Sequence, residues 1–389
     1  MQIVFYSNFL NLHQLPLCIE FSKHSEIQFT FVACEKIPQE RLDMQYQDLD
    51  SQYPFVLKAY SSKTNYEYAL KLAETADVVI HGAAPNIYLE NRLKKNKITF
   101  KFCERSLKKG TWRRFIPITY KKIYDGYIRY RKKSFWVLCA SAYASNDLRL
   151  CGFPVDKCFK WGYFPELEQL DPEEIWKHKK PNSILWVGRN IPCKHLELAI
   201  QLAKNLKKQN YHFELNIIGS GQSEELKSEL TKQKLDKNVH LLGSMEQEYV
   251  RRYMKSSEIF LFTSDFYEGW GAVVNEAMNS ACALVISHAC GSAKYLINRN
   301  NGSIFSFPDQ QDLFDKVTNY LNNKDLAKTH GLEAYYSLAN TWSVSNAVNN
   351  FLEIVKNLPE LDCYNILEGP GSRAEPVKNN WIKYDRKSE

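Results

Sequence analysis

Two glutamates in the second half of the chain are the side chains best suited to do chemistry. Glu268 and Glu276 lie in DFYEGWGAVVNEAMN (265–279), directly after the hydrophobic run EIFLFTS (258–264). The hinge between them consists of Gly269, Trp270 and Gly271. A carboxylate is a poor partner for a phosphate, but its oxygens accept hydrogen bonds from hydroxyl groups. The pattern therefore favours a site that holds two polyol groups, one at the loop and one at the start of a helix.

Two cations follow an earlier hydrophobic run. Arg189 and Lys194 come directly after SILWVG (183–188). A forked guanidinium that can contact two oxygens and a compact ammonium together suit a diphosphate. Glycines at the ends of the hydrophobic runs let the backbone approach a ligand. They are Gly188, Gly219, Gly221 and Gly243. A diphosphate between two polyols describes a nucleotide sugar.

Each of these signals also has a structural interpretation. Two glutamates at a loop and a helix start can be solvated partners of the helix dipole. An isolated Arg–Lys pair is usually a surface feature, and GSG (219–221) alone is a weak turn signal. Their joint occurrence at the ends of predicted strands favours a binding site, because ligands of parallel α/β sheets bind beyond the carboxyl ends of the strands.

The elements that position these residues alternate between apolar runs and helical periodicity. This alternation is typical of a parallel sheet covered by helices on both faces. In the second half, the predicted strands are 183–188, 213–219, 239–243, 258–264 and 282–287, and the predicted helices are 195–208, 223–234, 246–256 and 272–280. In the first half, the predicted strands are 2–6, 27–34, 76–81, 98–102 and 135–140. The predicted fold class is α/β, with two Rossmann-like doubly wound domains facing each other across a cleft.

The length of 389 residues suits two domains of ordinary size. We place the first domain at 1–165, a linker rich in Pro and charge at 166–182, and the second domain at 183–340. A helix with a Ser/Thr cap is predicted at 341–358, and an irregular tail at 359–389.

Composition narrows the class of protein. The content of 44% hydrophobic and 13% aromatic residues excludes wholesale disorder. The absence of a basic leader and of an apolar run of about 18 residues predicts a cytoplasmic protein. The ten cysteines include no CxxC pair and lack partners at metal-ligand spacing, so we expect buried free thiols and no metal site.

Positive charge is concentrated in one segment of the first half. The net charge is +7, yet residues 92–133 alone carry sixteen Lys and Arg against two acids, a net charge of +14. TYKKIYDGYIRYRKK (119–133) interleaves Tyr and Ile with cations, as an interfacial helix on an anionic membrane does. A nucleic acid is the rival partner, and a plain solvated face is the third alternative. The nucleotide-sugar pattern favours the membrane, so no nucleic acid is expected.

The second half resembles a known family. LWVGRNIPCKHLELAIQLAKNL, ELNIIGSGQSEELKSELTKQKLDKNVHLLGSM and SEIFLFTSDFYEGWGAVVNEAMNSACALVIS resemble the donor half of retaining glycosyltransferases of the group 1 (family 4) type, which have the GT-B fold. The similarity covers 183–305, and two glutamates separated by seven residues in an EGxG loop are its most specific mark. HQLP (13–16) and CASAYASNDLRLCGFPVDKCFKWGYFPE are similar to the bacterial surface-polysaccharide branch.

The resemblance implies roles for individual residues. Glu268 would face the transferred sugar, Glu276 would hold the ribose, and Arg189 and Lys194 would hold the diphosphate. The residues expected to bind the donor are Gly188, Gly219, Gly243, Glu268, Gly269, Trp270, Gly271 and Glu276, with Glu268, Arg189, Lys194 and His81 as the catalytic set. The first domain would bind the acceptor, the second the nucleotide sugar, and the helix 341–358 would cross back to the first domain.

Two histidines complete the list of candidates. His81 ends the predicted strand ADVVIH (76–81), and it either orients a sugar or is a structural histidine with satisfied hydrogen bonds. His13 is a weaker candidate on the acceptor side. We expect no metal or other cofactor, because Arg189 and Lys194 would occupy the usual place of the metal beside the departing diphosphate.

The function predicted from these patterns is metal-independent transfer of a hexose with retained configuration. The sugar would move from a nucleotide diphosphate sugar to a glycan or lipid-linked acceptor in bacterial cell-surface polysaccharide synthesis. The enzyme would be cytoplasmic and peripheral on the inner face of the membrane, which it would contact through 92–133. Two alternatives remain open at this point: a nucleotide-sugar 2-epimerase of the same architecture, and a non-enzymatic nucleic-acid-binding protein that uses the basic segment.

Overall fold

The protein consists of two compact units, each built on its own parallel sheet. The computed structural model describes residues 1–39, 48–358 and 366–385. Unit 1 comprises Met1–Glu166 and Ser343–Lys378, and unit 2 comprises Leu167–Trp342 and Asn379–Glu389. The predicted class of two doubly wound α/β domains is confirmed, because in both sheets the strands are parallel and alternate along the chain with helices.

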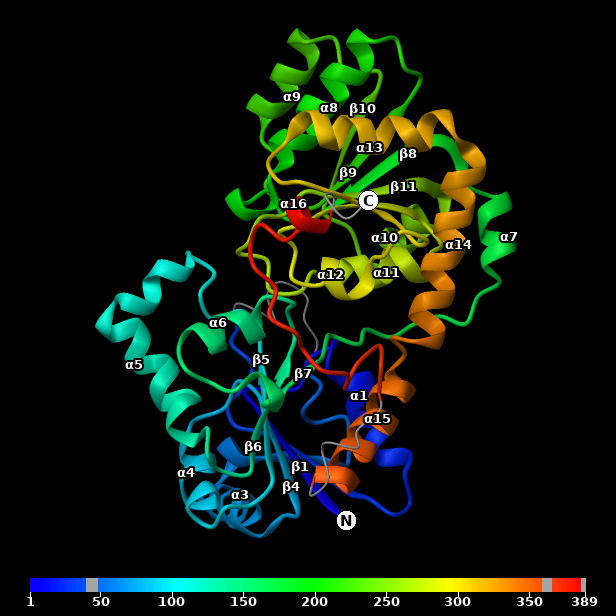
Figure 1. Ribbon diagram of the computed structural model, residues 1–389. Helices are drawn as coiled ribbons and strands as arrows, with labels where there is room; N and C mark the ends of the chain where they lie inside the picture. Colours follow the sequence, from blue (N-terminus) through cyan, green and yellow to red (C-terminus); the bar gives the residue numbers. More distant parts are fainter. Residues whose placement is uncertain (40–47, 359–365, 386–389) are drawn as a thin grey trace. The chain divides into compact units, whose positions relative to one another are not determined.

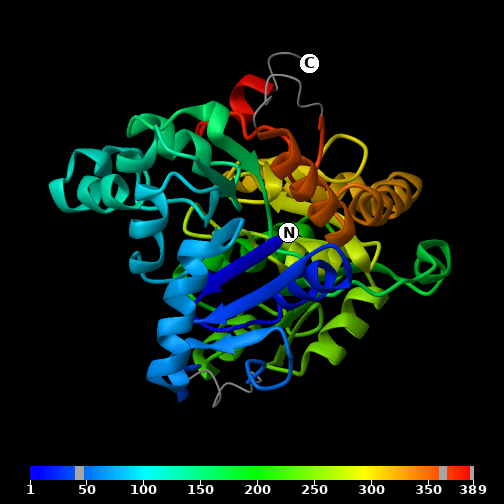
Figure 2. The ribbon, with the colours of Figure 1, turned by 90° about the horizontal axis from the view of Figure 1, so that it is seen from below.

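A seven-stranded parallel sheet forms the centre of unit 1, in the order β3-β2-β1-β4-β5-β6-β7 (Figure 1). Its strands are β1 (Gln2–Ser7), β2 (Gln28–Ala33), β3 (Val56–Lys58), β4 (Val78–His81), β5 (Thr99–Cys103), β6 (Phe135–Cys139) and β7 (Cys158–Lys160). Figure 2 shows β1 and β2 as neighbouring blue arrows. Phe5 of β1 is in register with Phe31 of β2 and Ile80 of β4, so apolar side chains continue across the middle of the sheet.

Helices cover this sheet, and one of them, α15 (Val344–Asn357), comes from a part of the chain that follows Leu167–Trp342 of unit 2. They are α1 (Leu15–Lys23), α3 (Lys63–Thr75), α4 (Ile87–Lys94), α5 (Pro117–Gly126), α6 (Ala144–Leu150) and α15 (Val344–Asn357), with the short 3₁₀ turns η1 (Ala59–Ser61), η2 (Thr111–Phe115), η3 (Ile128–Tyr130) and η4 (Val155–Lys157). The ring of Phe351 in α15 lies 5.6 Å from that of Phe21 in α1 and 4.8 Å from that of Phe100 in β5. Because α15 buries its apolar face here, it is part of the core of unit 1.

The sheet of unit 2 has six parallel strands in the order β10-β9-β8-β11-β12-β13. They are β8 (Lys180–Val187), β9 (Glu214–Ile218), β10 (Val239–Gly243), β11 (Ser257–Phe262), β12 (Ala283–Ser287) and β13 (Ser303–Phe305). β8 lies between β9 and β11, and the direction in which strands are added reverses there. Loops on either side of such a switch point diverge and leave room for a ligand at the carboxyl edge.

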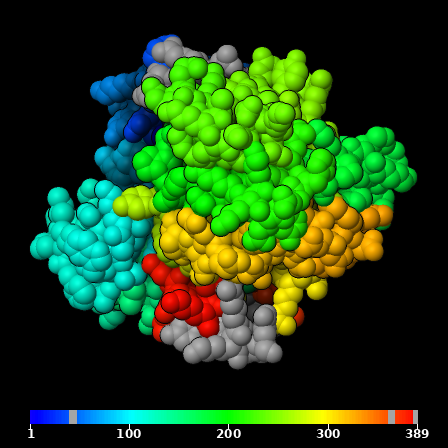
Figure 3. Space-filling model, turned by 90° about the horizontal axis from the view of Figure 1, so that it is seen from above, coloured from blue at the N-terminus to red at the C-terminus, as the bar shows by residue number. Residues whose placement is uncertain are grey.

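The helices of unit 2 are α7 (Pro172–Lys177), α8 (Leu196–Lys208), α9 (Glu224–Lys232), α10 (Gln247–Ser256), α11 (Val273–Asn279), α12 (Ala293–Leu296), α13 (Gln310–Asn322), α14 (Lys324–Asn340) and α16 (Ile382–Asp385). Side chains of the green α8 and α9 and the orange α13 cover unit 2 in the view from above (Figure 3). α8 buries Leu198, Leu202 and Leu206 in a core that also contains Ile184 of β8 and Ile259 of β11. The positions of these leucines repeat every four residues, which keeps one face of the helix on the sheet.

Two segments differ from the sequence-based expectation. The predicted linker 166–182 is mostly part of unit 2, where it supplies α7 and the first residues of β8. Asp171 caps α7 by accepting hydrogen bonds from the backbone N–H groups of Glu173 and Glu174, so the charges seen in the sequence start a helix. The described part of the predicted tail is divided: 366–378 belong to unit 1, whereas 379–385 belong to unit 2 and include α16. Residues 359–365 and 386–389 of that tail lie outside the described residues.

Candidate functional site

Loops that follow the strands of unit 2 are layered on one another at the carboxyl edge of the sheet. The backbone N–H of Gly188 donates to Ile218, and that of Gly219 donates to Gly243, at 2.9 and 2.8 Å. At Gly219, which has a φ of 145°, a Cβ atom would lie only 1.8 Å from the carbonyl oxygen of Gly188. Gly219 is therefore required for contact between two loops, which is a different reason from the ligand approach inferred from the sequence. Gly243, with a φ of 72°, has open space where its Cβ would be.

Lys194 and Glu268 meet at this edge. The Nζ of Lys194 forms a salt bridge with the Oε2 of Glu268, and the two side chains are only 16% and 15% exposed. The hydroxyl of Ser264 donates to the same Oε2 at 3.2 Å, and the ammonium lies 4.9 Å from the centre of the Phe262 ring. The loops after β8 and β11 thus hold one cation and one carboxylate in a partly buried cluster.

A chain of hydrogen bonds fixes the backbone of these two loops. The indole N–H of Trp186 donates to the Oγ1 of Thr263, and that hydroxyl donates to the carbonyl oxygen of Lys194, at 2.9 and 2.6 Å. The N–H of Asp265 donates to the carbonyl oxygen of Cys193 at 3.0 Å. Because the bonds link adjacent strands, the position of Lys194 depends on the loop that carries Glu268.

His195 ties the same loops together through its side chain. Its Nε2 lies 3.1 Å from the Oδ2 of Asp265, and its Nδ1 lies 2.5 Å from the Oε1 of Glu197. His195 has a left-handed backbone, with φ and ψ both at 51°. Residues other than glycine in this region are strained, and such strain is often found at functional sites. His195, Asp265 and Ser264 were not among the residues predicted from the sequence. The positions of Ser264 and Asp265 directly after the hydrophobic run of β11 were the available signal.

The Gly-Trp-Gly hinge is largely a structural device. The ring of Trp270 is buried, and its indole N–H donates to the Oδ1 of Asn275 at 2.9 Å. Gly269 is also buried, and Gly271 has a φ of 86° and would place a Cβ 2.9 Å from the Phe262 ring. The Trp270 ring packs inside unit 2, so only the backbone of the hinge is left to face a donor.

Glu276 lies in the first turn of α11 and has its own partners. It is half-buried, and its Oε1 accepts a hydrogen bond from the amide of Gln247 at 3.0 Å. Burial raises the pKa of its carboxyl, while the nearby Arg251 guanidinium and the Gln247 bond act in the opposite direction. A carboxylate in this state gains from further hydrogen-bond donors, such as the hydroxyls of a ribose.

Arg189 is exposed just beyond the end of β8. Within the described part of the chain its guanidinium forms no salt bridge. Its five N–H donors therefore lie in solvent at the carboxyl edge, in a loop that is adjacent to Lys194 in the sequence.

In unit 1, His81 ends β4 and is buried, with its Nε2 3.2 Å from the carbonyl oxygen of Pro85. Burial, aided by the Lys101 ammonium, lowers the pKa of His81 to about 3. The imidazole is therefore neutral at physiological pH and its Nδ1 has no hydrogen-bond partner in the described residues. His13 is half-buried, stands edge-on to the Tyr163 ring with centres 5.8 Å apart, and has a pKa lowered by burial.

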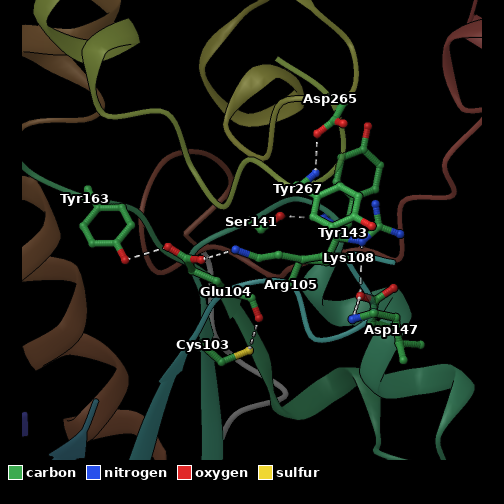
Figure 4. A network of polar contacts seen from close by, with 11 residues as sticks. Cys103, Glu104, Arg105, Lys108, Ser141, Tyr143, Asp147, Tyr163, Asp265 and Tyr267 are labelled. Carbon is green, nitrogen blue, oxygen red and sulfur yellow. Dashed lines mark hydrogen bonds and ion pairs between the residues drawn. The ribbon is translucent and has the colours of Figure 1, made fainter. Parts of the chain in front are cut away.

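A polar network at the carboxyl edge of unit 1 was missed by the sequence analysis (Figure 4). Glu104, directly after β5, accepts a hydrogen bond from the Tyr163 hydroxyl at 2.8 Å and pairs with the Nζ of Lys108 at 2.6 Å. Next to it, Arg105 and Asp147 form a buried ion pair at 3.3 Å. Burial raises the pKa of the Asp147 carboxyl, and the adjacent Arg105 guanidinium opposes that shift. Glu104 was counted only as an acid within a basic segment, although its place after a predicted strand was the signal.

Two negative findings concern the described residues alone. Among residues 1–39, 48–358 and 366–385, no three His, Cys, Asp or Glu side chains gather closely enough to bind a metal ion. Over the same ranges, every helix is too short or too polar to span a membrane. Nine cysteines fall in the described parts, and all are free thiols, seven of them buried.

Comparisons with known proteins agree with the geometry of unit 2. Residues 169–335 match the family model of glycosyl transferases group 1. The chain is 25% identical over 205 residues to the poly(ribitol-phosphate) alpha-N-acetylglucosaminyltransferase of Staphylococcus aureus, which covers 48% of this chain and 41% of that protein. It is 32% identical over 140 residues to the amylovoran biosynthesis glycosyltransferase AmsK of Erwinia amylovora, which covers 34% of each chain.

The fold as a whole matches a solved structure. Anabaena Alr3699/HepE, crystallised in complex with UDP, superposes with a TM-score of 0.67 at 13% identity, over 92% of this chain and 100% of that one. The chain spans about half or less of the length of the curated relatives it matches. Residues 169–335 are thus similar to a group 1 glycosyltransferase domain, and the protein has the two-domain Rossmann-like architecture of the GT-B fold.

Proposed function

We propose that this protein is a retaining glycosyltransferase that moves a hexose from a nucleotide diphosphate sugar to a glycan or lipid-linked acceptor. The observation that carries the proposal is the contact of Lys194 with Glu268 at the carboxyl edge of unit 2. A cation beside a carboxylate at a switch point suits a ligand in which a diphosphate adjoins a sugar. The group 1 match over 169–335 and the UDP bound by HepE support it.

In this proposal each side chain contacts one part of the donor. Lys194 and the exposed Arg189 bind the diphosphate oxygens. Glu268, held by Lys194 and Ser264, accepts hydrogen bonds from hydroxyls of the sugar. Glu276 accepts hydrogen bonds from the ribose, which compensates the burial that raises its pKa. The backbones of Gly188, Gly243, Gly269 and Gly271 border the donor, and Gly219 supports them through the loop contact.

Catalysis then depends on the charge that develops on the departing diphosphate. As the bond between the anomeric carbon and the diphosphate oxygen breaks, negative charge grows on that oxygen. The acceptor oxygen bonds to the anomeric carbon on the same face of the sugar, and the proton of its hydroxyl passes to the departing diphosphate oxygen. Preorganised cations at such an oxygen contribute about 3 kcal/mol each to transition-state stabilisation. Because Lys194 is already fixed by Glu268, little reorganisation is needed. Arg189 and Lys194 take the role that a metal has elsewhere, so the reaction is metal-independent.

Unit 1 supplies the acceptor side. The neutral imidazole of His81 has one nitrogen without a protein partner in the described residues and can orient a sugar hydroxyl. His13 lies beside Tyr163, which is bonded to Glu104. The exposed cations of the segment 92–133 suit an anionic membrane surface. The protein would therefore act in cell-surface polysaccharide synthesis as a cytoplasmic enzyme on the inner face of the membrane. None of the relatives described above is an epimerase or a nucleic-acid-binding protein, so nothing favours the two alternatives.

The donor is identified first, and the assignment of Arg189 to the diphosphate is then tested with it. A panel of nucleotide sugars is screened by thermal shift. The true donor should raise the midpoint of unfolding of the protein, because a ligand stabilises the folded state by mass action. With that donor, Arg189→Ala should lower kcat/KM by about 100-fold. Lys237→Ala, which removes an exposed cation of unit 2 far along the chain from these loops, is the control. A loss of less than about tenfold for Arg189→Ala would contradict the role of Arg189 at the diphosphate.

A further inference from the structure

Residues 108–124 of unit 1, here named the wedge, expose large apolar side chains that the donor site does not use. The wedge contains η2 and most of α5 and follows β5, so it begins at the carboxyl edge of the sheet. Trp112 is 59% exposed, Phe115 73% and Ile118 67%. Figure 1 shows α5, in cyan to green, standing at the outer side of unit 1. Side chains of this size are normally exposed singly, not in a row.

The concentration of these side chains is local. Fourteen large hydrophobic side chains are exposed in the described residues, and five of them fall within thirteen consecutive positions of the wedge. These five are Trp112, Phe115, Ile118, Tyr120 and Tyr124. The rings of Tyr120 and Tyr124 are 6.3 Å apart, on one face of α5. A local concentration of exposed apolar side chains of this kind is typical of an interaction site.

Positive charge predominates around these side chains, although Lys108 pairs with Glu104 and Lys121 pairs with Asp125, two acids that flank the wedge. The wedge has six Lys and Arg residues and no acid. The guanidinium of Arg114 lies 4.2 Å from the centre of the Phe115 ring, and that of Arg113 lies 5.7 Å from the Trp112 ring. Each of these two exposed rings of η2 therefore has a guanidinium over its face, so apolar and positively charged groups lie side by side. An interfacial segment has this arrangement, with apolar groups at the acyl boundary and cations among the headgroup phosphates.

The rest of the basic segment is not equivalent. Arg92 is fully buried and donates to the carbonyl oxygens of Ala73, Ala76 and Asp77. Lys101 is buried too, with its Nζ 4.7 Å from the centre of the Tyr127 ring. These cations hold the fold together, so the charge available to a partner is smaller than +14 and is coupled to the apolar wedge.

We propose that the wedge docks the protein on the surface of an anionic lipid bilayer by inserting Trp112, Phe115 and Ile118 below the headgroups. The proposal deepens the proposed function, on which it rests for the lipid-linked acceptor, while the exposed side chains and the charge carry the docking itself. A nucleic acid would use the cations and stack on the rings but has no place for Ile118, the aliphatic member of the set. Insertion also explains why the wedge has both exposed apolar side chains and cations. Binding at a membrane surface needs buried apolar area as well as attraction to anionic lipid.

Sedimentation with vesicles separates the two contributions. The full chain is mixed with vesicles of phosphatidylcholine alone and with vesicles containing about one-third phosphatidylglycerol, at two salt concentrations. Wild-type protein should sediment with the anionic vesicles only. The triple variant Trp112→Ser, Phe115→Ser, Ile118→Ser should bind them at least about tenfold more weakly, and Lys109→Glu with Lys122→Glu should also weaken binding, the more so at low salt.

Matched control variants remove exposed aromatic rings and reverse lysine charges outside the wedge. Tyr66→Ser, Tyr68→Ser and Tyr249→Ser remove three exposed aromatic rings outside the wedge, and Lys232→Glu with Lys237→Glu makes the same charge change in unit 2. Neither control set should alter vesicle binding by more than about twofold. All variants should keep the wild-type midpoint of unfolding, because the altered side chains are exposed.

Three results would overturn the proposal: no binding of wild type to anionic vesicles, equal binding of the triple variant and its control, or tighter binding of the wedge to single-stranded RNA than to the vesicles. The shift of the unfolding midpoint that a nucleotide sugar causes distinguishes failure of the docking proposal from failure of the proposed function. It is measured for the wild type and for the triple variant. A triple variant that loses vesicles but keeps the wild-type shift supports the wedge. A wild-type protein that shows no shift with any nucleotide sugar refutes the glycosyltransferase proposal and leaves the docking result to stand by itself.

Discussion

The Nζ of Lys194 and the Oε2 of Glu268 form a salt bridge between side chains that are 74 positions apart in the sequence. Both are about five-sixths buried, so the pair lies between the solvent-screened and the fully buried extremes. Removing one partner leaves the other charge in a poorly solvated place. In the proposed enzyme that cost is met when the donor arrives, because the diphosphate and the sugar hydroxyls provide new partners for the two charges.

The first prediction concerns Glu268→Gln. The free energy of unfolding should fall by about 1 kcal/mol without donor, because the Lys194 ammonium loses its charged partner while Ser264 can still hydrogen-bond the amide. Transfer should fall by about 100-fold in kcat/KM. Urea unfolding and steady-state kinetics measure the two effects. Glu229→Gln, at an exposed position of α9, is the control, and equal kinetics for the two variants would contradict the role of Glu268.

The second prediction concerns the pH dependence that Glu276 confers. Its pKa is raised by burial from the ordinary carboxyl value of 4.5, so the folded state binds this proton more tightly than the unfolded state. Stability from this group is therefore greatest at low pH and falls as pH rises through 4.5 and the raised pKa. Glu276→Gln should remove that fall.

Unfolding in urea at pH 4.5 and pH 7 measures this effect. At pH 7, Glu276→Gln should be at least as stable as the wild type, yet its Kd for the donor should rise about tenfold, since the amide is a weaker acceptor for the ribose hydroxyls. A variant that is destabilised at pH 7 and binds the donor normally would contradict both parts of the prediction.

The third prediction concerns His195, a positioning residue. His195→Gly keeps the left-handed backbone and removes both ring contacts, to Asp265 and Glu197. His195→Ala also removes the contacts but retains the strain of a Cβ at a φ of 51°. Alanine should therefore be less stable than glycine by about 1 kcal/mol. Both variants should raise the KM for the donor. Restoration of KM by His195→Gln, whose amide reaches the place of the imidazole Nε2 and can hydrogen-bond Asp265, separates positioning from a general loss of stability.

The fourth prediction compares two glycines that both have positive φ. Gly219→Ala should destabilise unit 2 by about 3 kcal/mol or more, because its Cβ would overlap the carbonyl oxygen of Gly188. Gly243→Ala should cost only about 1 kcal/mol, since its Cβ meets open space and only the backbone is strained. The midpoints of thermal unfolding test this difference. Similar losses for the two variants would show that loop contact is not the reason for Gly219.

Strand prediction from the sequence was most accurate where apolar runs are continuous. The runs at 258–264 and 282–287 correspond to β11 and β12, which are buried on both faces. The parallel α/β class predicted from these runs is confirmed. The three-residue strands β3, β7 and β13 were missed, because so short a run has no readable period. The hydrogen bond from the Trp270 indole to Asn275 could not be foreseen from spacing, because it depends on the packing of α11.

The sequence by itself determined which residue types follow which strands, and therefore that Lys194 and Glu268 would stand at one edge of a sheet, because parallel strands end together. Only the tertiary structure decided that the two side chains touch, that His195 adopts a left-handed backbone between two carboxylates, and that Arg92 is buried while Trp112 is exposed. Those outcomes depend on side-chain packing between residues far apart in the chain. Local patterns of charge and hydrophobicity carry no information about such contacts.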